Sequence, residues 1–142
     1  MDEQAAALLA RVVEAWVADP DSDVVYAEEV EGRLAVRMRQ QVREATTVWF
    51  RVGDISLIAE AYVIPTPVDA LLAYRQALVR NGRSFRVNFA LDQEGALVLR
   101  ARIPLERVSA TELSYLLAEI YETIEVSFAS LVGLVSQREK MR

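Results

Sequence analysis

The sequence predicts an α+β fold, an antiparallel sheet with helices packed mainly on one of its faces. Between residues 33 and 104, short runs alternate apolar and polar side chains, which is typical of half-buried strands. Longer segments with apolar residues at helical spacing precede, separate and follow these runs. Tight-turn signals at Gly53-Asp54 and Asp92–Gly95 indicate hairpins. We expect the order αβββ(β)αββα within a single domain over residues 1–142.

The first helix is predicted over Glu3–Ala18, where apolar side chains recur at helical spacing and the acidic run DPDSD ends it. The alternating aspartates of that run are also found at the start of a calcium-binding loop. Such a loop needs a turn glycine where this chain has Val24, and a glutamate where it has Val30. The pattern therefore indicates a helix stop, and we expect no metal site.

Two strand regions are predicted next. Leu34, Val36 and Met38 share one face of a strand, and Arg33, Arg37 and Arg39 share the other. Residues 45–64 read as a hairpin with a two-residue turn at Gly53-Asp54. This register pairs Val48, Phe50 and Val52 with Ala59, Leu57 and Ile55 on the inner face, and places Trp49 opposite Ile58 and Arg51 opposite Ser56.

A second helix is predicted over residues 66–82, with Thr66 as its cap, Pro67 at its first position, Asp69 near the positive end of its dipole and Asn81-Gly82 at its end. Residues 84–104 then form another hairpin, closed by a left-handed Gly95. Its register sets Arg86 opposite Arg102 and Asn88 opposite Arg100. A capping box at Ser109–Glu112 begins a last helix that runs to about Arg138.

Composition excludes much chemistry. The chain has no histidine and no cysteine, so imidazole- or thiol-based catalysis and zinc sites of the usual type are ruled out. We expect a protein that is not an enzyme and needs no cofactor, although a site built from carboxylates alone stays open. The net charge of -5 argues against nucleic acid and anionic lipid as partners.

The sequence also suggests a location. The apolar run over residues 126–135 is shorter than the roughly 18 residues that a membrane span requires. The first residues lack the basic region of a signal peptide. We therefore expect a cytoplasmic protein, and its strong preference for arginine over lysine hints at a GC-rich bacterial genome.

The face of the sheet away from the helices is the candidate binding surface. It combines arginines with large apolar side chains, a mixture typical of interface hot spots, and arginine binds carboxylates in bidentate fashion. The candidate partner-binding residues are Arg33, Arg37, Arg39, Trp49, Arg51, Ile58, Tyr62, Arg86, Arg100 and Arg102. In the alternative interpretation, Glu28, Glu44 and Glu60 neutralise these arginines within the monomer and the face has no function.

The last helix carries apolar residues over more than one stripe, from Leu113 to Val135. One interpretation is a homodimer interface, which we favour, and the other is a core helix that crosses the whole sheet.

Residues 64–128, from "IPTPVDALLAYRQALVRNG" through "SFRVNFALDQEGALVLRARIP" to "SATELSYLLAEIYETIEVSF", resemble the YbjN-like family. The resemblance rests on the order helix, strand, turn, strand and long helix, and no catalytic motif accompanies it. That family is similar to class I type III secretion chaperones, small acidic α+β proteins that act as homodimers and bind extended segments of partner proteins without ATP. Some members are described as regulators of sensory transduction. The resemblance therefore implies a chaperone-like or regulatory adaptor with a protein partner, such as a signalling protein.

Two functions thus remain. The leading hypothesis is a non-enzymatic, homodimeric protein-binding module. The alternative is a sensor domain that binds a small acidic ligand.

Overall fold

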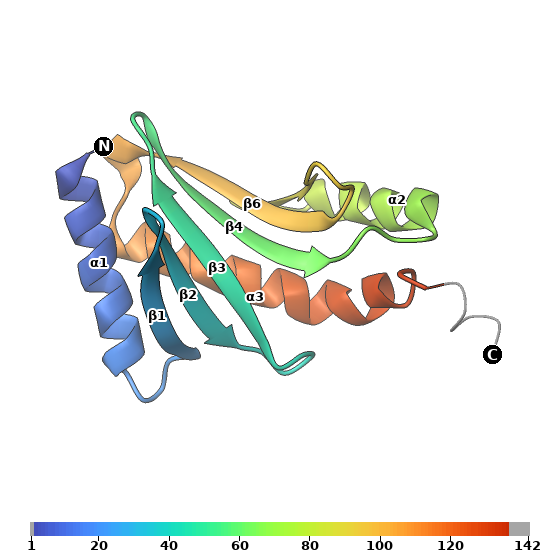
Figure 1. The fold of residues 1–142 in the computed structure, drawn as a ribbon, viewed down its shortest axis with the longest axis horizontal. Helices are drawn as coiled ribbons and strands as arrows, with labels where there is room; N and C mark the ends of the chain where they lie inside the picture. Colours follow the sequence, from blue (N-terminus) through green and yellow to red (C-terminus); the bar gives the residue numbers. More distant parts are fainter. Residues whose placement is uncertain (1, 137–142) are drawn as a thin grey trace.

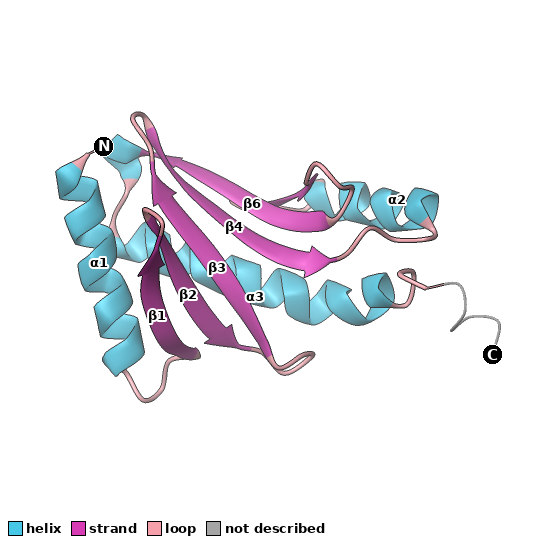
Figure 2. Ribbon diagram, in the orientation of Figure 1, coloured by secondary structure: helices cyan, strands magenta, loops and turns pink. Residues whose placement is uncertain are grey.

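The computed structural model describes residues 2–136, which form an antiparallel six-stranded sheet with three helices against it (Figures 1 and 2). The strand order is β1-β2-β3-β4-β6-β5. The strands are β1 Val24–Val30, β2 Arg33–Arg39, β3 Ala45–Val52, β4 Ser56–Ile64, β5 Asn88–Leu91 and β6 Leu97–Pro104. The helices are α1 Glu3–Ala18, α2 Ala70–Asn81, α3 Ala110–Val132 and a short 3-10 turn, η1, Leu105–Arg107. The predicted α+β fold is confirmed.

The helices cover one face of the sheet and leave the other uncovered. In Figure 2, α3 runs behind the strands, α2 lies at the β5 end and α1 at the β1 end, with no helix in front. Alternate strand residues point toward the helices and are buried, among them Val36, Val48, Phe50, Leu57 and Leu99. This pattern agrees with the predicted inner face, and it leaves the other side of the sheet open to contact.

Helix α1 has the predicted bounds. The Asp2 side chain accepts hydrogen bonds from the backbone N–H groups of Gln4 at 2.9 Å and Ala5 at 3.1 Å, which satisfies donors that the first turn leaves free. The Trp16 ring packs 6.5 Å from that of Phe50 on β3, so α1 joins the same core.

Helix α3 supplies much of that core. Leu113, Leu116, Ile120, Ile124 and Leu131 are all buried beneath the sheet. The apolar surface that favoured a dimer therefore lies largely inside the monomer, as the core interpretation has it. The helix ends at Val132 and not near Arg138, a residue outside the described part of the chain.

The register of the first predicted hairpin was wrong by two residues. Val48 pairs with Ala61 and not Ala59, and Trp49 and Arg51 pair with Glu60 and Ile58. The turn lies one residue later than predicted, because the N–H of Gly53 donates to the Ser56 carbonyl at 2.9 Å and encloses Asp54 and Ile55, which leaves Ile55 80% exposed. A shift of two residues keeps each strand side chain on its predicted face.

The start of α2 was also mispredicted. Asp69 is the cap and accepts from the N–H of Leu72 at 3.3 Å. The Thr66 hydroxyl instead donates to the Glu94 carbonyl at 2.5 Å, which ties this segment to the β5–β6 turn. Thr66 and Pro67 therefore belong to the connection that precedes the helix.

The hairpin of β5 and β6 is confirmed from Asn88 onward. Asn88 pairs with Arg100 and Leu91 with Leu97, and Gly95 closes the turn with a φ of +88°. The strand begins only at Asn88, so Phe85 and Arg86 lie outside it.

Candidate partner-binding face

The uncovered side of the sheet, here named the outer face, brings most of the candidate residues together. Neighbouring strands place Ile58 of β4 between Arg51 of β3 and Arg102 of β6. The next row along the strands holds Trp49, Glu60 and Arg100 in the same order. Alternation along each strand therefore gathers cations and large apolar side chains on this face.

A shallow pocket of about 290 Å³ lies on the outer face. It is lined by Arg33, Trp49, Arg51, Ile58, Glu60, Tyr62, Asp92 and Val98. Five of these eight were candidates from the sequence. The other three, Glu60, Asp92 and Val98, reach the pocket through the β4–β6 pairing and the turn after β5, and the sequence does not reveal that strand order.

The Arg33 guanidinium stacks on the ring of Trp49, with its central carbon 4.4 Å from the ring centre. A cation above an indole face is attracted by the electron-rich ring. The stack keeps Trp49 partly covered and fixes a cation at the rim of the pocket. Burial raises the pKa of nearby Tyr62, and the carboxylates of Asp92 and Glu94 add to that rise.

Some outer-face arginines are neutralised inside the monomer. Arg100 pairs with Glu60 across β4 and β6 at 2.8 Å, and Arg37 pairs with Glu44 at 3.6 Å. The Arg39 guanidinium donates to the backbone carbonyl of Ser22 at 3.2 Å. For these arginines the interpretation of internal pairing applies, so they are weaker candidates for binding a partner.

Arg33, Arg51 and Arg102 form no ion pair with any residue in the described part of the chain. All three are exposed on the outer face. Their charges are thus available to an external carboxylate, close to Trp49 and Ile58.

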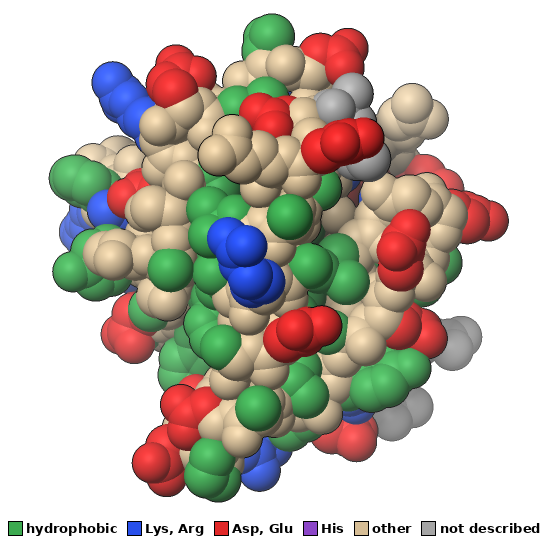
Figure 3. Space-filling model, turned by 90° about the vertical axis from the view of Figure 1, so that its left-hand side faces the viewer, with side chains coloured by type: hydrophobic (Ala, Val, Ile, Leu, Met, Phe, Trp, Pro, Cys, Tyr) green, Lys and Arg blue, Asp and Glu red, His purple; other side chains and the backbone are tan. Residues whose placement is uncertain are grey.

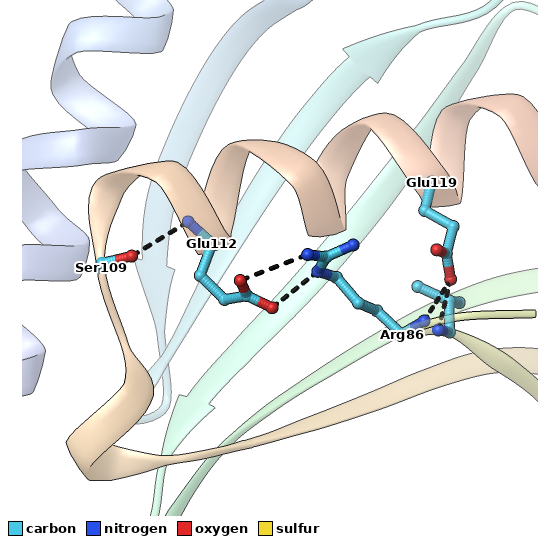
Figure 4. A network of polar contacts seen from close by, with 5 residues as sticks. Arg86, Ser109, Glu112 and Glu119 are labelled. Carbon is cyan, nitrogen blue, oxygen red and sulfur yellow. Dashed lines mark hydrogen bonds and ion pairs between the residues drawn. The ribbon is translucent and has the colours of Figure 1, made fainter.

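Arg86 was placed wrongly on the outer face. Its Nε donates to Glu112 of α3 at 2.6 Å, so its guanidinium turns toward the helices (Figure 4). The guanidinium also lies over the rings of Phe85 and Tyr115, 4.9 and 5.0 Å from their centres. Arg86 is a structural clamp in the monomer, and no row of the outer face contains it.

The backbone next to Arg86 explains its position. A carboxylate oxygen of Glu119 accepts hydrogen bonds from the N–H groups of Arg86 at 2.7 Å and Val87 at 2.5 Å (Figure 4). These two donors are therefore satisfied by α3, and the chain joins the sheet only at Asn88.

The described residues form neither a metal-binding cluster nor a membrane-spanning helix. Over residues 2–136, no three acidic side chains come close enough to hold a metal ion. None of the helices within that range is both long and apolar enough to cross a bilayer.

Residues 10–131 match the sequence profile of the YbjN family, described as "Putative bacterial sensory transduction regulator". The match spans most of the chain, well beyond the segment that carried the resemblance. The chain belongs to the YbjN family.

The YbjN protein is similar to proteins of mycobacteria. An uncharacterized protein of Mycobacterium leprae is 32% identical over 103 residues, which are 72% of this chain and 56% of the relative. An uncharacterized protein of Mycobacterium tuberculosis is 32% identical over 84 residues, 58% of this chain and 46% of the relative. The chain thus spans about half the length of the curated relatives it matches.

Proposed function

We propose that this YbjN protein is a non-enzymatic regulatory module that binds an acidic segment of a partner protein on its outer face. The observation that carries the proposal is the group of Arg33, Arg51 and Arg102, cations without a carboxylate partner in the described monomer, beside the exposed part of Trp49. The family description, a regulator of sensory transduction, supports a role in contact with another protein.

The arginines and the apolar residues of the outer face would contact different side chains of the partner. The planar guanidiniums of Arg51 and Arg102 each match a carboxylate with two parallel donors. Ile58 lies between them, so an apolar side chain of the partner can pack there while its acidic neighbours reach the arginines. A partner strand with acidic, apolar and acidic residues at positions i, i+2 and i+4 fits this row, because alternate side chains of a strand point to the same face.

The finer features implied by the resemblance belong to the same proposal: chaperone-like binding of an extended segment, and a homodimer. The burial of α3 leaves the dimer without its original support from the last helix. Light scattering measures the oligomeric state independently of partner binding.

A second candidate function is a sensor for a small acidic ligand, favoured by the pocket of about 290 Å³ with Arg33 and Arg51 in its wall. Thermal-shift measurements with dicarboxylates and nucleotides distinguish the two, since a ligand specific for the folded state raises the melting temperature by mass action. A saturable rise that Arg51→Glu abolishes would favour the sensor.

Photo-crosslinking from the outer face tests the leading proposal. Tyr62 is 48% exposed on the outer face, and Tyr115 is 56% exposed on α3, so a benzoylphenylalanine at either position samples opposite sides of the molecule. We expect crosslinks from position 62 to peptides rich in Asp and Glu, and these should disappear in the variant Arg51→Glu/Arg102→Glu.

The matched control is Arg11→Glu/Arg107→Glu, which makes the same change of charge at two exposed arginines of α1 and η1. The crosslinks from position 62 should persist in this control variant. Equal crosslinking in both variants, or the same peptides from position 115, would contradict the outer face as the binding site.

A further inference from the structure

Helix α2 packs in an unusual manner, with small side chains inward and large apolar side chains outward. Ala73 and Ala77 are 0% and 3% exposed, whereas Leu71 and Leu78 are 83% and 69% exposed. An ordinary surface helix does the reverse. Exposed apolar side chains gathered on one helix, unlike scattered ones, indicate a surface that another molecule covers.

A groove of about 330 Å³ runs along α2 on its α3 side. Leu72 and Val79 of α2 and Val126 and Leu131 of α3 supply its apolar wall. Gln76 and Ser130 bridge the two helices with a hydrogen bond of 2.7 Å, so the walls are held in place. A further hollow of about 220 Å³, lined by Leu78 and Leu91 with no charged residue, extends the apolar surface to the β5 side of α2.

Among the described residues, the charged side chains that line the groove are all positive. They are Arg75, Arg80 and Arg83, and none of the described residues that line it is a carboxylate. This is a cationic site in a chain of net charge -5. Acidic side chains are instead spread over the α1 end of the molecule, with few basic ones among them (Figure 3). The groove is therefore complementary to an apolar segment flanked by carboxylates.

A second copy of α2 fits this site poorly. Residues 70–81 contain Arg75 and Arg80 but no acidic residue, so two facing α2 helices would bring like charges together. A helical segment matches better, because Leu71 and Leu78, like Leu72 and Val79, are seven residues apart and form a ridge along the helix. The 12 residues of α2 extend about 18 Å, or roughly three turns of a docked helix.

From these observations we propose that the α2–α3 groove binds an acidic amphipathic helix of a partner protein, at a site separate from the outer face. Its leucine-type side chains would fill the groove, and its flanking glutamates or aspartates would pair with Arg75, Arg80 and Arg83. The proposal concerns other residues than the outer face, so each can fail without the other.

Fluorescence anisotropy with designed peptides tests the groove. The probe is a labelled peptide of about 14 residues with Leu at positions i, i+3, i+4 and i+7 and Glu beside them. We expect saturable binding that weakens with added salt and by at least about tenfold in Arg75→Glu/Arg83→Glu. Leu78→Ser/Val79→Ser should weaken it similarly, and Arg51→Glu/Arg102→Glu on the outer face should leave it unchanged.

Any of four results would overturn the proposal. Binding of a peptide with Lys in place of Glu, or with scrambled leucine spacing, at equal affinity would remove the claimed specificity. Absence of saturable binding of the acidic peptide to the intact chain would show that the groove is not such a site. Light scattering that shows a wild-type dimer, converted to a monomer by Leu78→Ser/Val79→Ser, would assign the surface to a second copy.

Discussion

The Arg33 guanidinium on β2 stacks 4.4 Å above the Trp49 ring on β3, on the face of the sheet that no helix covers. Strand alternation brings the two side chains to the same face, and the β2–β3 pairing of Ala35 with Trp49 brings them within reach. The pair places a fixed cation beside an aromatic surface at the edge of the outer-face pocket.

Removal of this stack should be visible in the fluorescence of Trp49. In a Trp16→Phe background, Trp49 is the one remaining tryptophan. Arg33→Ala should shift its emission to longer wavelength, because water replaces the guanidinium, and should lower the free energy of unfolding by about 0.5–1 kcal/mol. Arg37→Ala is the control and should leave the emission unchanged. An unshifted spectrum in Arg33→Ala would mean that the stack does not persist in solution.

The inverted packing of α2 predicts an inverted response to substitution. Leu78→Ser should change the free energy of unfolding by no more than about 0.5 kcal/mol, because the side chain is 69% exposed. Ala77→Leu should destabilise by about 1–3 kcal/mol, since the alanine is 3% exposed and a larger side chain overpacks the core. Urea unfolding measures both. Greater destabilisation by Leu78→Ser would show that α2 faces the sheet with its leucines.

Alanine substitutions at two glycines with positive φ distinguish the cost of backbone strain from the cost of a steric clash. Gly32, at φ +79°, has open space where a Cβ would lie, so Gly32→Ala should cost about 1–2 kcal/mol from strain alone. Gly95, at φ +88°, would bring its Cβ within 3.1 Å of the Tyr74 hydroxyl, which donates to the Gly95 carbonyl. Thermal unfolding should therefore show a larger loss for Gly95→Ala, and equal losses would contradict the contact.

The Arg86–Glu112 clamp should make stability depend on pH in the acidic range. The hydrogen bond from Arg86 lowers the pKa of Glu112 below its ordinary value of 4.5, with a further contribution from the Arg86 charge, although burial opposes both. Since the folded pKa lies below the unfolded one, the stabilisation is present above about pH 4.5 and disappears as the pH falls through the folded pKa.

The variant Arg86→Met should accordingly be less stable than wild type near neutral pH and approach it in acid. Urea unfolding across this pH range measures the difference, with the exposed Arg83→Met as the control. A difference that stays constant from neutral to acid pH would assign the effect to lost packing on Tyr115 and not to the ion pair.

The sequence predicts the parts of this fold that depend on local alternation and capping. The bounds of α1, the Ser109 cap of α3 and the pairing of Asn88 with Arg100 are of this kind, because residues close in the chain determine them. The Arg86 clamp is different. Glu112, Glu119 and Glu125 look like ordinary exposed residues along a helix, yet each holds a segment that reaches it from the sheet.

Those contacts join residues far apart in sequence. Glu125 accepts hydrogen bonds from the Gln40 side chain at 2.6 Å and the N–H of Gln41 at 2.9 Å, and it thereby ties the β2–β3 connection to α3. Alternation alone placed Arg86 on the outer face, because nothing local reveals that Glu119 captures its backbone. The outer-face cluster follows from alternation, but which of its arginines are neutralised depends on the strand order.

The most direct test of the proposed binding face is a titration followed by Trp49 fluorescence in the Trp16→Phe protein. The probe is a short peptide with Glu, Leu and Glu at every second position and Ser between them, and the control is the same peptide with Lys in place of Glu. We predict a saturable shift of the emission to shorter wavelength with the Glu peptide alone, reduced by salt and absent in Arg51→Glu/Arg102→Glu. An unchanged spectrum at saturating peptide, or the same shift with the Lys peptide, would contradict binding of acidic segments at the outer face.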